Sequence, residues 1–312
     1  MTERAYVREV GLRDGLQMVK TVLSSDRKLE WCCGALDAGI SEIELTSFVP
    51  AKIVPQFADS DEVFRRANET RTNGTLSALV PNLRGAQRGM ELGVGKLNYV
   101  LSASEEHNMA NVRRSTDESI ADFGRIVQLR DAATGVGVRL GAGIATSFGC
   151  TISGAVSERR VVAIAERLAA LGADEIIVAD TVGYGDPAQV KRLMSAVVRA
   201  VAPLPVAAHF HDTRGLGLAN VAAALDAGVR AFDASLGGLG GCPFAPGATG
   251  NIDTEDTVFM LEAMGFDTGI DIERLIALRA KVERWLPGEK MGGAIARAGV
   301  PKTFRMPVEK AA

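Results

Sequence analysis

The sequence predicts an α/β protein whose eight parallel strands close into a barrel surrounded by helices. Three observations predict this fold: short β-rich segments recur along the chain, their spacing matches that of βα units, and helix signals lie between them. The chain has 312 residues, of which 47% are hydrophobic and 23% charged, as in globular proteins with a substantial core. Since one barrel of about 250 residues fills this length, we expect a (β/α)8 TIM barrel with extra C-terminal helices.

Eight β-rich segments provide the predicted strands. Their spacing varies around the roughly 30 residues that one βα unit of a parallel sheet occupies. The strands are expected at residues 6–10, 42–48, 75–80, 96–102, 137–145, 175–180, 205–212 and 231–236. The main alternative is a doubly wound open sheet, which would carry a G-x-G-x-x-G turn after its first strand. Here that strand is followed by GLRDG at 11–15, so the barrel is favoured.

Helix boundaries lie between these strands. Ser115 and Glu118 have the spacing of a capping box, and Asp186 places an N-cap acceptor before Pro187 at a first helical position. Glycines that can end a helix in the left-handed conformation precede four strands, at Gly39, Gly93, Gly172 and Gly228. Because one junction type occurs four times, a single repeated architecture is predicted.

The C-terminal part is expected to add helices to the barrel. Helices are predicted near 253–264 and 271–285, and the stretch from Pro287 reads as a loosely held tail or a surface strap. We therefore expect one barrel domain over residues 1–285 and a C-terminal tail over 286–312.

Charge and composition argue against several classes of function. Lys and Arg total 35 against 38 Asp and Glu, so no basic surface for nucleic acid or an anionic membrane is expected. No apolar stretch approaches the roughly 18 residues of a membrane span, and the N-terminus lacks the apolar region of a secretory signal. Four cysteines in so long a chain do not indicate a disulfide framework. We expect a cytoplasmic protein that binds neither nucleic acid nor membrane.

Polar residues at the carboxyl ends of the predicted strands form the candidate site, because barrel enzymes carry their chemistry there. His209 and His211 are two residues apart on one strand and so face the same side. Together with Asp14 and an amide or a water, they could form a mixed nitrogen and oxygen site. Such a site suits Mg²⁺ or Mn²⁺ better than structural Zn²⁺. The alternative is that one histidine packs in the core and the other caps a loop.

Two further side chains stand out at the predicted mouth. Arg13 could stabilise a developing enolate or carboxylate oxygen, although on an open surface it would form only a solvated pair with Asp14. Cys242 lies in the glycine-dense segment GGLGGCPFAPGATGN at 237–251. On such a loop a thiol could transfer a proton, whereas a buried cysteine is usually a small hydrophobic residue.

These residues resemble the 3-hydroxy-3-methylglutaryl-CoA lyase family, within the metal-dependent TIM-barrel lyases. The resemblance covers about residues 5–285 and is most specific in its first and last blocks. The matching blocks are VREVGLRDGLQ at 7–17, ELTSFV at 44–49, PNL at 81–83, DTVG at 180–183, HFHDT at 209–213 and the segment 237–256 with GNIDTED.

The resemblance implies a role for each candidate residue. The ligands of a divalent cation, Mg²⁺ or Mn²⁺, would be Asp14, His209, His211 and Asn251. Arg13 would polarise the thioester carbonyl, Cys242 would be the acid and base on the loop, and Asp14 or His209 would relay the hydroxyl proton. The residues that position these groups and form the path for the proton would be Gln17, Glu44, Asp180 and Glu255.

The resemblance also implies a reaction and its setting. The substrate would be an acyl-CoA thioester of the 3-hydroxy-3-methylglutaryl-CoA type, cleaved to acetyl-CoA and acetoacetate by a carbon–carbon lyase. We further expect a cytoplasmic homodimer with a place in leucine catabolism.

One loop departs from the family pattern and leaves the acyl group open. After the fifth strand the family usually has Gly-Cys followed by Pro, an aromatic residue, Glu and Gly. Here Gly149-Cys150 is followed by Thr151, Ile152, Ser153 and Gly154. A related 3-hydroxyacyl-CoA, such as a citramalyl-CoA-type substrate, is therefore an alternative. A Claisen-type synthase on the same barrel is another, although such enzymes usually carry extra C-terminal domains. A non-enzymatic barrel would predict an incomplete ligand set, which the sequence does not have.

Overall fold

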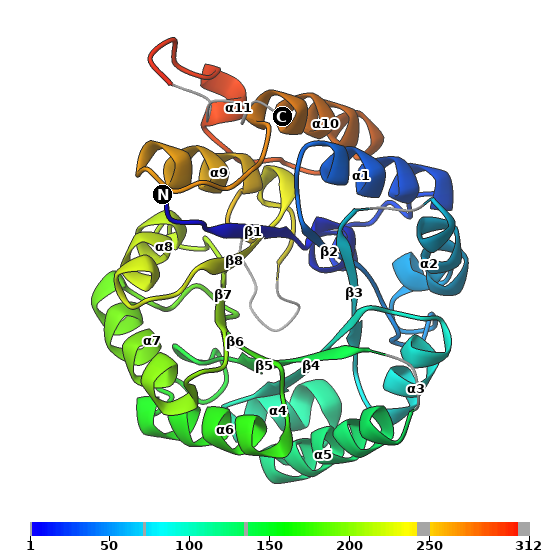
Figure 1. The fold of residues 1–312 in the computed structure, drawn as a ribbon, viewed down its shortest axis with the longest axis vertical. Helices are drawn as coiled ribbons and strands as arrows, with labels where there is room; N and C mark the ends of the chain where they lie inside the picture. Colours follow the sequence, from blue (N-terminus) through cyan, green and yellow to red (C-terminus); the bar gives the residue numbers. More distant parts are fainter. Residues whose placement is uncertain (1, 71–72, 134–136, 242–249, 305–312) are drawn as a thin grey trace.

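In the computed structural model, which describes residues 2–70, 73–133, 137–241 and 250–304, the strands close into a parallel barrel ringed by helices (Figure 1). Each strand pairs with its neighbours in the sequence, and β1 pairs with β8 to close the ring. The strands are β1 Tyr6–Glu9, β2 Glu42–Ser47, β3 Thr75–Val80, β4 Lys96–Ser102, β5 Arg139–Ala145, β6 Glu175–Asp180, β7 Val206–Phe210 and β8 Ala231–Ala234. The predicted fold is confirmed, and every strand begins within two residues of its expected start.

The helices lie on the outside of the barrel (Figure 1). They are α1 Ser25–Asp37, α2 Ser60–Glu69, α3 Leu83–Glu91, α4 Glu105–Val112, α5 Thr116–Ala132, α6 Glu158–Leu171, α7 Pro187–Val201, α8 Gly217–Asp226, α9 Thr254–Ala263, α10 Ile272–Trp285 and α11 Ile295–Ala298. Short turns of other helix types are η1 Gly11–Gly15, η2 Pro55–Phe57 and η3 Leu236–Gly238. Among the described helices, none combines the length and apolar character that crossing a membrane would need.

The boundary signals of the sequence act as expected. Ser115 and Glu118 form a complete capping box at the start of α5, and the Asp186 side chain accepts a hydrogen bond from the Gln189 N–H in the first turn of α7. All four predicted junction glycines have positive φ, between 74° and 110°, the conformation that ends a helix. Helix α4 was not predicted; its Ser104 N-cap accepts from the His107 N–H.

Apolar and charged side chains are separated by the wall of the barrel. Outside it, Tyr99 of β4 stacks near Phe123 of α5, with ring centroids 5.8 Å apart. Inside it, the Lys96 ammonium lies 2.7 Å from carboxylate oxygens of both Glu42 and Glu175. Charges buried on this scale are tolerated only when they are paired. The barrel axis is therefore lined by an ion-pair network, above which the strand ends open.

The C-terminal helices complete the ring. Helices α9 and α10 lie where the sequence predicts them, and α10 packs against α1 (Figure 1). The chain beyond them turns back over the loop that follows β8. There the Gly292 N–H donates to the Gly237 carbonyl at 2.6 Å, and the Asp256 carboxylate accepts from the N–H groups of Ala294 and Ile295. These contacts hold part of the 286–304 segment on the surface as a strap.

Candidate active site

Asp14, His209 and His211 meet at the carboxyl end of the barrel. One ligand atom of each lies within 4.8 Å of those of the other two. Asp14 comes from η1 directly after β1, whereas the two histidines come from β7 and the residue just beyond it. Their rings share a side, as the two-residue spacing predicts, with centroids 5.2 Å apart. Asn251 forms an isolated bridge with His211 and donates from Nδ2 to Asp14 Oδ2 at 2.8 Å. The four residues expected to be ligands are therefore adjacent.

The donor set fits a divalent cation. Asn251 Nδ2 donates to Asp14 and to the Leu239 carbonyl, while the buried Asn251 Oδ1 has no hydrogen-bond partner among the described residues. Nδ1 of the buried His211 likewise has none within the described parts of the chain. Buried polar atoms without partners are rare, and an amide oxygen beside a carboxylate and imidazoles is the chemistry of an Mg²⁺ or Mn²⁺ site.

Charge around Asp14 keeps it ionised. Burial alone would raise the pKa of this carboxyl group. The Arg13 guanidinium and the imidazoles of His211 and His209 outweigh burial and hold the pKa of Asp14 well below its ordinary value. Asp14 is therefore a carboxylate at neutral pH, as a metal ligand must be.

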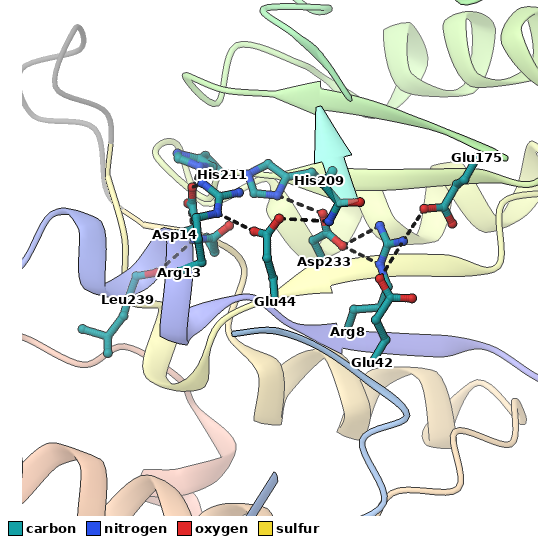
Figure 2. Close-up of polar contacts among 12 residues, drawn as sticks. Arg8, Arg13, Asp14, Glu42, Glu44, Glu175, His209, His211, Asp233 and Leu239 are labelled. Atoms are coloured by element: carbon teal, nitrogen blue, oxygen red, sulfur yellow. Dashed lines mark hydrogen bonds and ion pairs between the residues drawn. The ribbon is translucent and has the colours of Figure 1, made fainter. Parts of the chain in front are cut away.

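Arg13 is fixed between two carboxylates. It forms ion pairs with Asp14 and Glu44, as Figure 2 shows, and Glu44 in turn accepts from Asn98 Nδ2 at 2.9 Å. Burial opposes the charge of Arg13, but Glu44 and Asp14 outweigh it and raise its pKa above the ordinary value. The guanidinium is thus charged and oriented at the mouth. Asn98 was missed from the sequence, although an amide within the apolar run KLNYVLS could have signalled it.

His209 has a carboxylate partner that sequence reasoning also missed. Its Nδ1 lies 3.2 Å from Asp233 Oδ2, and Asp233 contacts Arg8 on its other side (Figure 2). Burial would raise the pKa of Asp233, but Arg8 and His209 hold it below the ordinary value. Burial lowers the pKa of His209, yet the hydrogen bond to Asp233 and the charge of Asp14 raise it overall. An acidic residue within the apolar strand AFDAS was the available signal.

The remaining predicted residues stand around this cluster. The Asp180 carboxylate accepts from the N–H groups of Tyr184 and Gly185, each at 2.9 Å, and its carbonyl accepts from the His211 N–H. Burial raises the pKa of Asp180 despite these donors. The side chain thus orders the loop beside His211, while Gln17 lies half-buried three residues after Asp14.

Glu255 lies behind the loop that follows β8. Its Oε2 accepts from the Gly237 N–H at 3.1 Å, and its Oε1 lies 3.2 Å from Arg279 Nε. Burial and the neighbouring Asp253 raise the pKa of Glu255 well above the ordinary value. Cys242, the expected acid and base, lies outside the described residues.

Close backbone packing fixes Asn251. A Cβ added at Gly250 would lie 1.9 Å from the Gly238 carbonyl oxygen and 2.7 Å from Gly240 N, so only glycine fits there. A cavity of about 640 Å³ opens on this side, between the loop after β8 and the strap at 288–293. Asn251 lines it, but Asp14, His209 and His211 do not. The candidate metal site is therefore identified by the convergence of ligand atoms and not by this cavity.

Comparisons with known proteins are consistent over nearly the whole chain. Residues 4–282 match a family described as HMGL-like. The hydroxymethylglutaryl-CoA lyase YngG of Bacillus subtilis (strain 168) is 38% identical over 93% of this chain and 94% of its own length. The (R)-citramalyl-CoA lyase of Chloroflexus aurantiacus is 42% identical over 91% of this chain and 93% of its own.

Solved structures are similar to the same extent. An HMG-CoA lyase from Acenitobacter baumannii, in complex with coenzyme A and 3-methylmalate, has a TM-score of 0.89 and 43% identity, covering 98% of both chains. The HMG-CoA lyase of Bacillus subtilis has a TM-score of 0.88 and 36% identity, covering 95% of this chain and 98% of its own. The similarity includes the barrel and the C-terminal helices.

Proposed function

The chain belongs to the HMGL-like family, and from that premise we propose that it is a metal-dependent carbon–carbon lyase. Its substrate is a thioester of the 3-hydroxy-3-methylglutaryl-CoA type, and its products are acetyl-CoA and acetoacetate. The observation that carries the proposal is the convergence of Asp14, His209 and His211 beside a fixed guanidinium. The same group of residues would have no evident purpose in a purely structural barrel, where a charged cluster at the mouth is costly.

The cation would be held by the carboxylate of Asp14, the imidazoles of His209 and His211, and the amide oxygen of Asn251. Mg²⁺ or Mn²⁺ suits these ligands. When bound, such an ion supplies Lewis acidity that lowers the pKa of a substrate hydroxyl.

The side chains around the cation would divide the proton and charge transfers between them. The tertiary hydroxyl loses its proton to the Asp14 carboxylate, and the electrons of the C2–C3 bond flow into the thioester as C3 becomes a ketone. Arg13, held by Glu44 and Asp14, places its positive charge at the thioester oxygen where the enolate develops. Cys242 then donates a proton to C2, which gives acetyl-CoA.

A citramalyl-CoA-type substrate is a second candidate, favoured by the loop after β5. In place of the carboxylate of the family pattern, this loop carries Ser153, whose hydroxyl donates to Ser104 Oγ at 2.9 Å. Cys150 and Gly154 pair across the same tight turn, and Ile152 is half exposed. A loop that presents hydroxyl and aliphatic groups suits a different acyl end from one that presents a carboxylate. The relative from Chloroflexus aurantiacus supports this candidate.

The setting of the reaction completes the proposal. We place the enzyme in the cytoplasm as a homodimer, with acetyl-CoA and acetoacetate as products of leucine catabolism. A Claisen-type synthase, which would run the chemistry in the direction of condensation, is the alternative that an assay must distinguish.

A direct assay tests the function. Protein purified with EDTA and then supplied with Mg²⁺ or Mn²⁺ is offered 3-hydroxy-3-methylglutaryl-CoA, citramalyl-CoA and a longer 3-hydroxyacyl-CoA, with acetyl-CoA release as the readout. We expect cleavage of at least one thioester, abolished by EDTA and restored by metal. Condensation without cleavage would favour the synthase, and metal-independent cleavage would contradict the proposed site.

A further inference from the structure

Arg8 and Asp233 lie inside the barrel below His209, and none of the predicted roles uses them. Both side chains are buried, with 4% and 7% of their surface exposed. We propose that Arg8 and Asp233 form a positioning pair that holds His209 in the tautomer protonated at Nδ1 and so leaves its Nε2 free for the cation. The inference rests on the proposed metal site, but its key observable does not require metal or substrate.

The strand register places the three residues side by side. His209 of β7 pairs with Asp233 of β8, and Asp233 pairs with Arg8 of β1. Residues paired across neighbouring strands face the same side of the sheet, about 4.8 Å apart. The closure of the barrel between β8 and β1 therefore brings the guanidinium to the same carboxylate that faces the imidazole.

Both oxygens of Asp233 are committed, which fixes the proton on His209. Oδ1 accepts from Arg8 Nε at 2.6 Å, and Oδ2 lies 3.2 Å from His209 Nδ1, as the dashed lines in Figure 2 show. An ionised carboxylate can only accept hydrogen bonds, so Nδ1 must be the donor. The neutral imidazole then carries its lone pair on Nε2, the form in which histidine binds metals.

Arg8 is itself held on its other side by Glu175, which also pairs with Lys96. Its Nη1 lies 2.6 Å from Glu175 Oε2, and the same oxygen lies 2.7 Å from Lys96 Nζ. Because Arg8 holds Oδ1, the Asp233 carboxylate cannot rotate away from the ring, and Oδ2 stays opposite His209 Nδ1.

A purely structural role for the pair makes a different prediction. If Arg8 only balances charge in the barrel, removing Lys96 should affect the site as much as removing Arg8. Lys96 is the matched control, because it is buried, pairs with Glu42 and Glu175, and has no hydrogen bond to Asp233 among the described contacts.

The Asp233→Asn variant provides the sharpest test. Arg8 Nε requires an acceptor, so the amide oxygen should remain on Arg8 and the amide NH₂ should face His209. An NH₂ group donates, which forces the imidazole into the opposite tautomer with the proton on Nε2. In the double variant Arg8→Met with Asp233→Asn, the amide is free to turn, and the Nδ1–H tautomer should return in part.

The tautomer is read by long-range ¹H–¹⁵N spectra of the metal-free full-length protein, recorded at an alkaline pH at which the imidazole of His209 is neutral. The chain has only three histidines, so His107→Gln and His211→Asn variants assign the signals. We expect Nδ1–H at His209 in the wild type, Nε2–H in Asp233→Asn, and loss of a single tautomer in Arg8→Met and Arg8→Lys. Near-ultraviolet circular dichroism shows whether each variant is folded. If Asp233→Asn does not fold, Arg8→Lys takes its place in the test.

Mn²⁺ affinity gives the second readout. Loss of a partner that orients a ligating histidine typically weakens metal binding by about 10–100-fold. We expect that range for Asp233→Asn and Arg8→Met, partial recovery in the double variant, and less than about 3-fold change in Lys96→Met. The inference is overturned if His209 keeps Nδ1–H in both Asp233→Asn and Arg8→Met. It is also overturned if Lys96→Met weakens Mn²⁺ binding as much as Arg8→Met does. If the tautomer changes as expected but no thioester is cleaved, the inference stands and the proposed function fails.

Discussion

At the residue scale, the charges around Asp14 favour a bound cation. Asp14 is ionised because Arg13 and two imidazoles surround it, and Arg13 is itself balanced by Glu44. Two negative carboxylates thus share one guanidinium, and the pair of carboxylates can accept further positive charge. A divalent ion would supply it and would also satisfy the Asn251 Oδ1, which has no hydrogen-bond partner in the described parts of the chain.

Removing the charge of Asp14 should therefore release the metal. We expect Asp14→Asn to weaken Mn²⁺ binding by at least about 100-fold, the upper end of the losses caused by indirect partners, and to abolish metal-dependent turnover. Isothermal titration calorimetry with Mn²⁺ measures the first effect. Asp122→Asn is the control, because Asp122 of α5 is also a largely buried carboxylate paired with arginines, Arg114 and Arg125, but lies outside the barrel. Unchanged Mn²⁺ affinity in Asp14→Asn would show that Asp14 is not a ligand of the cation.

Cys242 should matter for turnover and not for the metal. We expect Cys242→Ala to lower kcat by about 10²–10⁴-fold, the usual contribution of a general acid, while Mn²⁺ affinity stays within the error of the wild type. The measurement is acetyl-CoA release together with a metal titration on the same preparation. Full activity in this variant would assign the proton to another group.

Glu9 is a fully buried carboxyl group that joins three site-bearing segments. Its Oε1 accepts from the N–H groups of Gly11 and Leu236, and its Oε2 accepts from Thr254 Oγ1 at 2.8 Å. Burial, only partly offset by these donors, raises the pKa of Glu9 to about 7. When Glu9 is protonated or replaced by Gln, its Oε2 or amide group can donate to the Thr254 hydroxyl, so the geometry survives the loss of charge.

The pH dependence of stability follows from that shift. The native state holds a proton on Glu9 up to about pH 7, whereas the ordinary pKa of a glutamate, which applies in the unfolded chain, is 4.5, so Glu9 makes the protein less stable as pH rises through this window. Relative to Glu9→Gln, the wild type should lose roughly 3 kcal/mol of unfolding free energy between pH 4.5 and pH 8. Urea unfolding of both proteins at several pH values measures this. A difference that is constant with pH would contradict the raised pKa.

At the scale of elements, the strands were predictable because each βα unit repeats a local pattern. A short apolar run, a helix and a terminal glycine recur, and these signals need no knowledge of distant contacts. Helix α4 was missed because its polar sequence carries little apolar periodicity. The polar interior was also missed: Arg8, Asn98 and Asp233 are visible as polar residues in apolar runs, but the identity of their partners depends on which strands meet when the barrel closes.

The loop after β8 illustrates how an element positions a proposed metal ligand. Gly250 packs directly on the Gly238 carbonyl, and the next residue is Asn251. We expect Gly250→Ala to displace Asn251, destabilise the fold by about 1–3 kcal/mol through overpacking, and weaken Mn²⁺ binding. Thermal unfolding and a metal titration check both effects. Gly288→Ala is the control, because a Cβ there meets nothing within 4 Å. Equal thermal stability and equal Mn²⁺ affinity of Gly250→Ala and Gly288→Ala would show that the close contact at Gly250 is not required for the fold or for metal binding.

At the scale of the whole molecule, the barrel brings together residues that are far apart in the chain. Asp14, His209 and Asn251 meet because β1, β7 and the segment after β8 end at the same mouth (Figure 1). The general rule that barrel chemistry lies at strand ends was enough to select Asp14 and the two histidines from the sequence. Asn251 and Glu255 lie beyond the last strand, where no periodic signal points to them, and only the family resemblance indicated them.

We propose that one divalent ion binds where these four side chains converge. The most direct test of this proposal is an anomalous difference map from crystals of the protein soaked in Mn²⁺. We expect a single strong peak about 2.0–2.4 Å from ligand atoms of Asp14, His209, His211 and Asn251. A map with no peak among these residues, or with Mn²⁺ bound elsewhere while the four stay unligated, would contradict it.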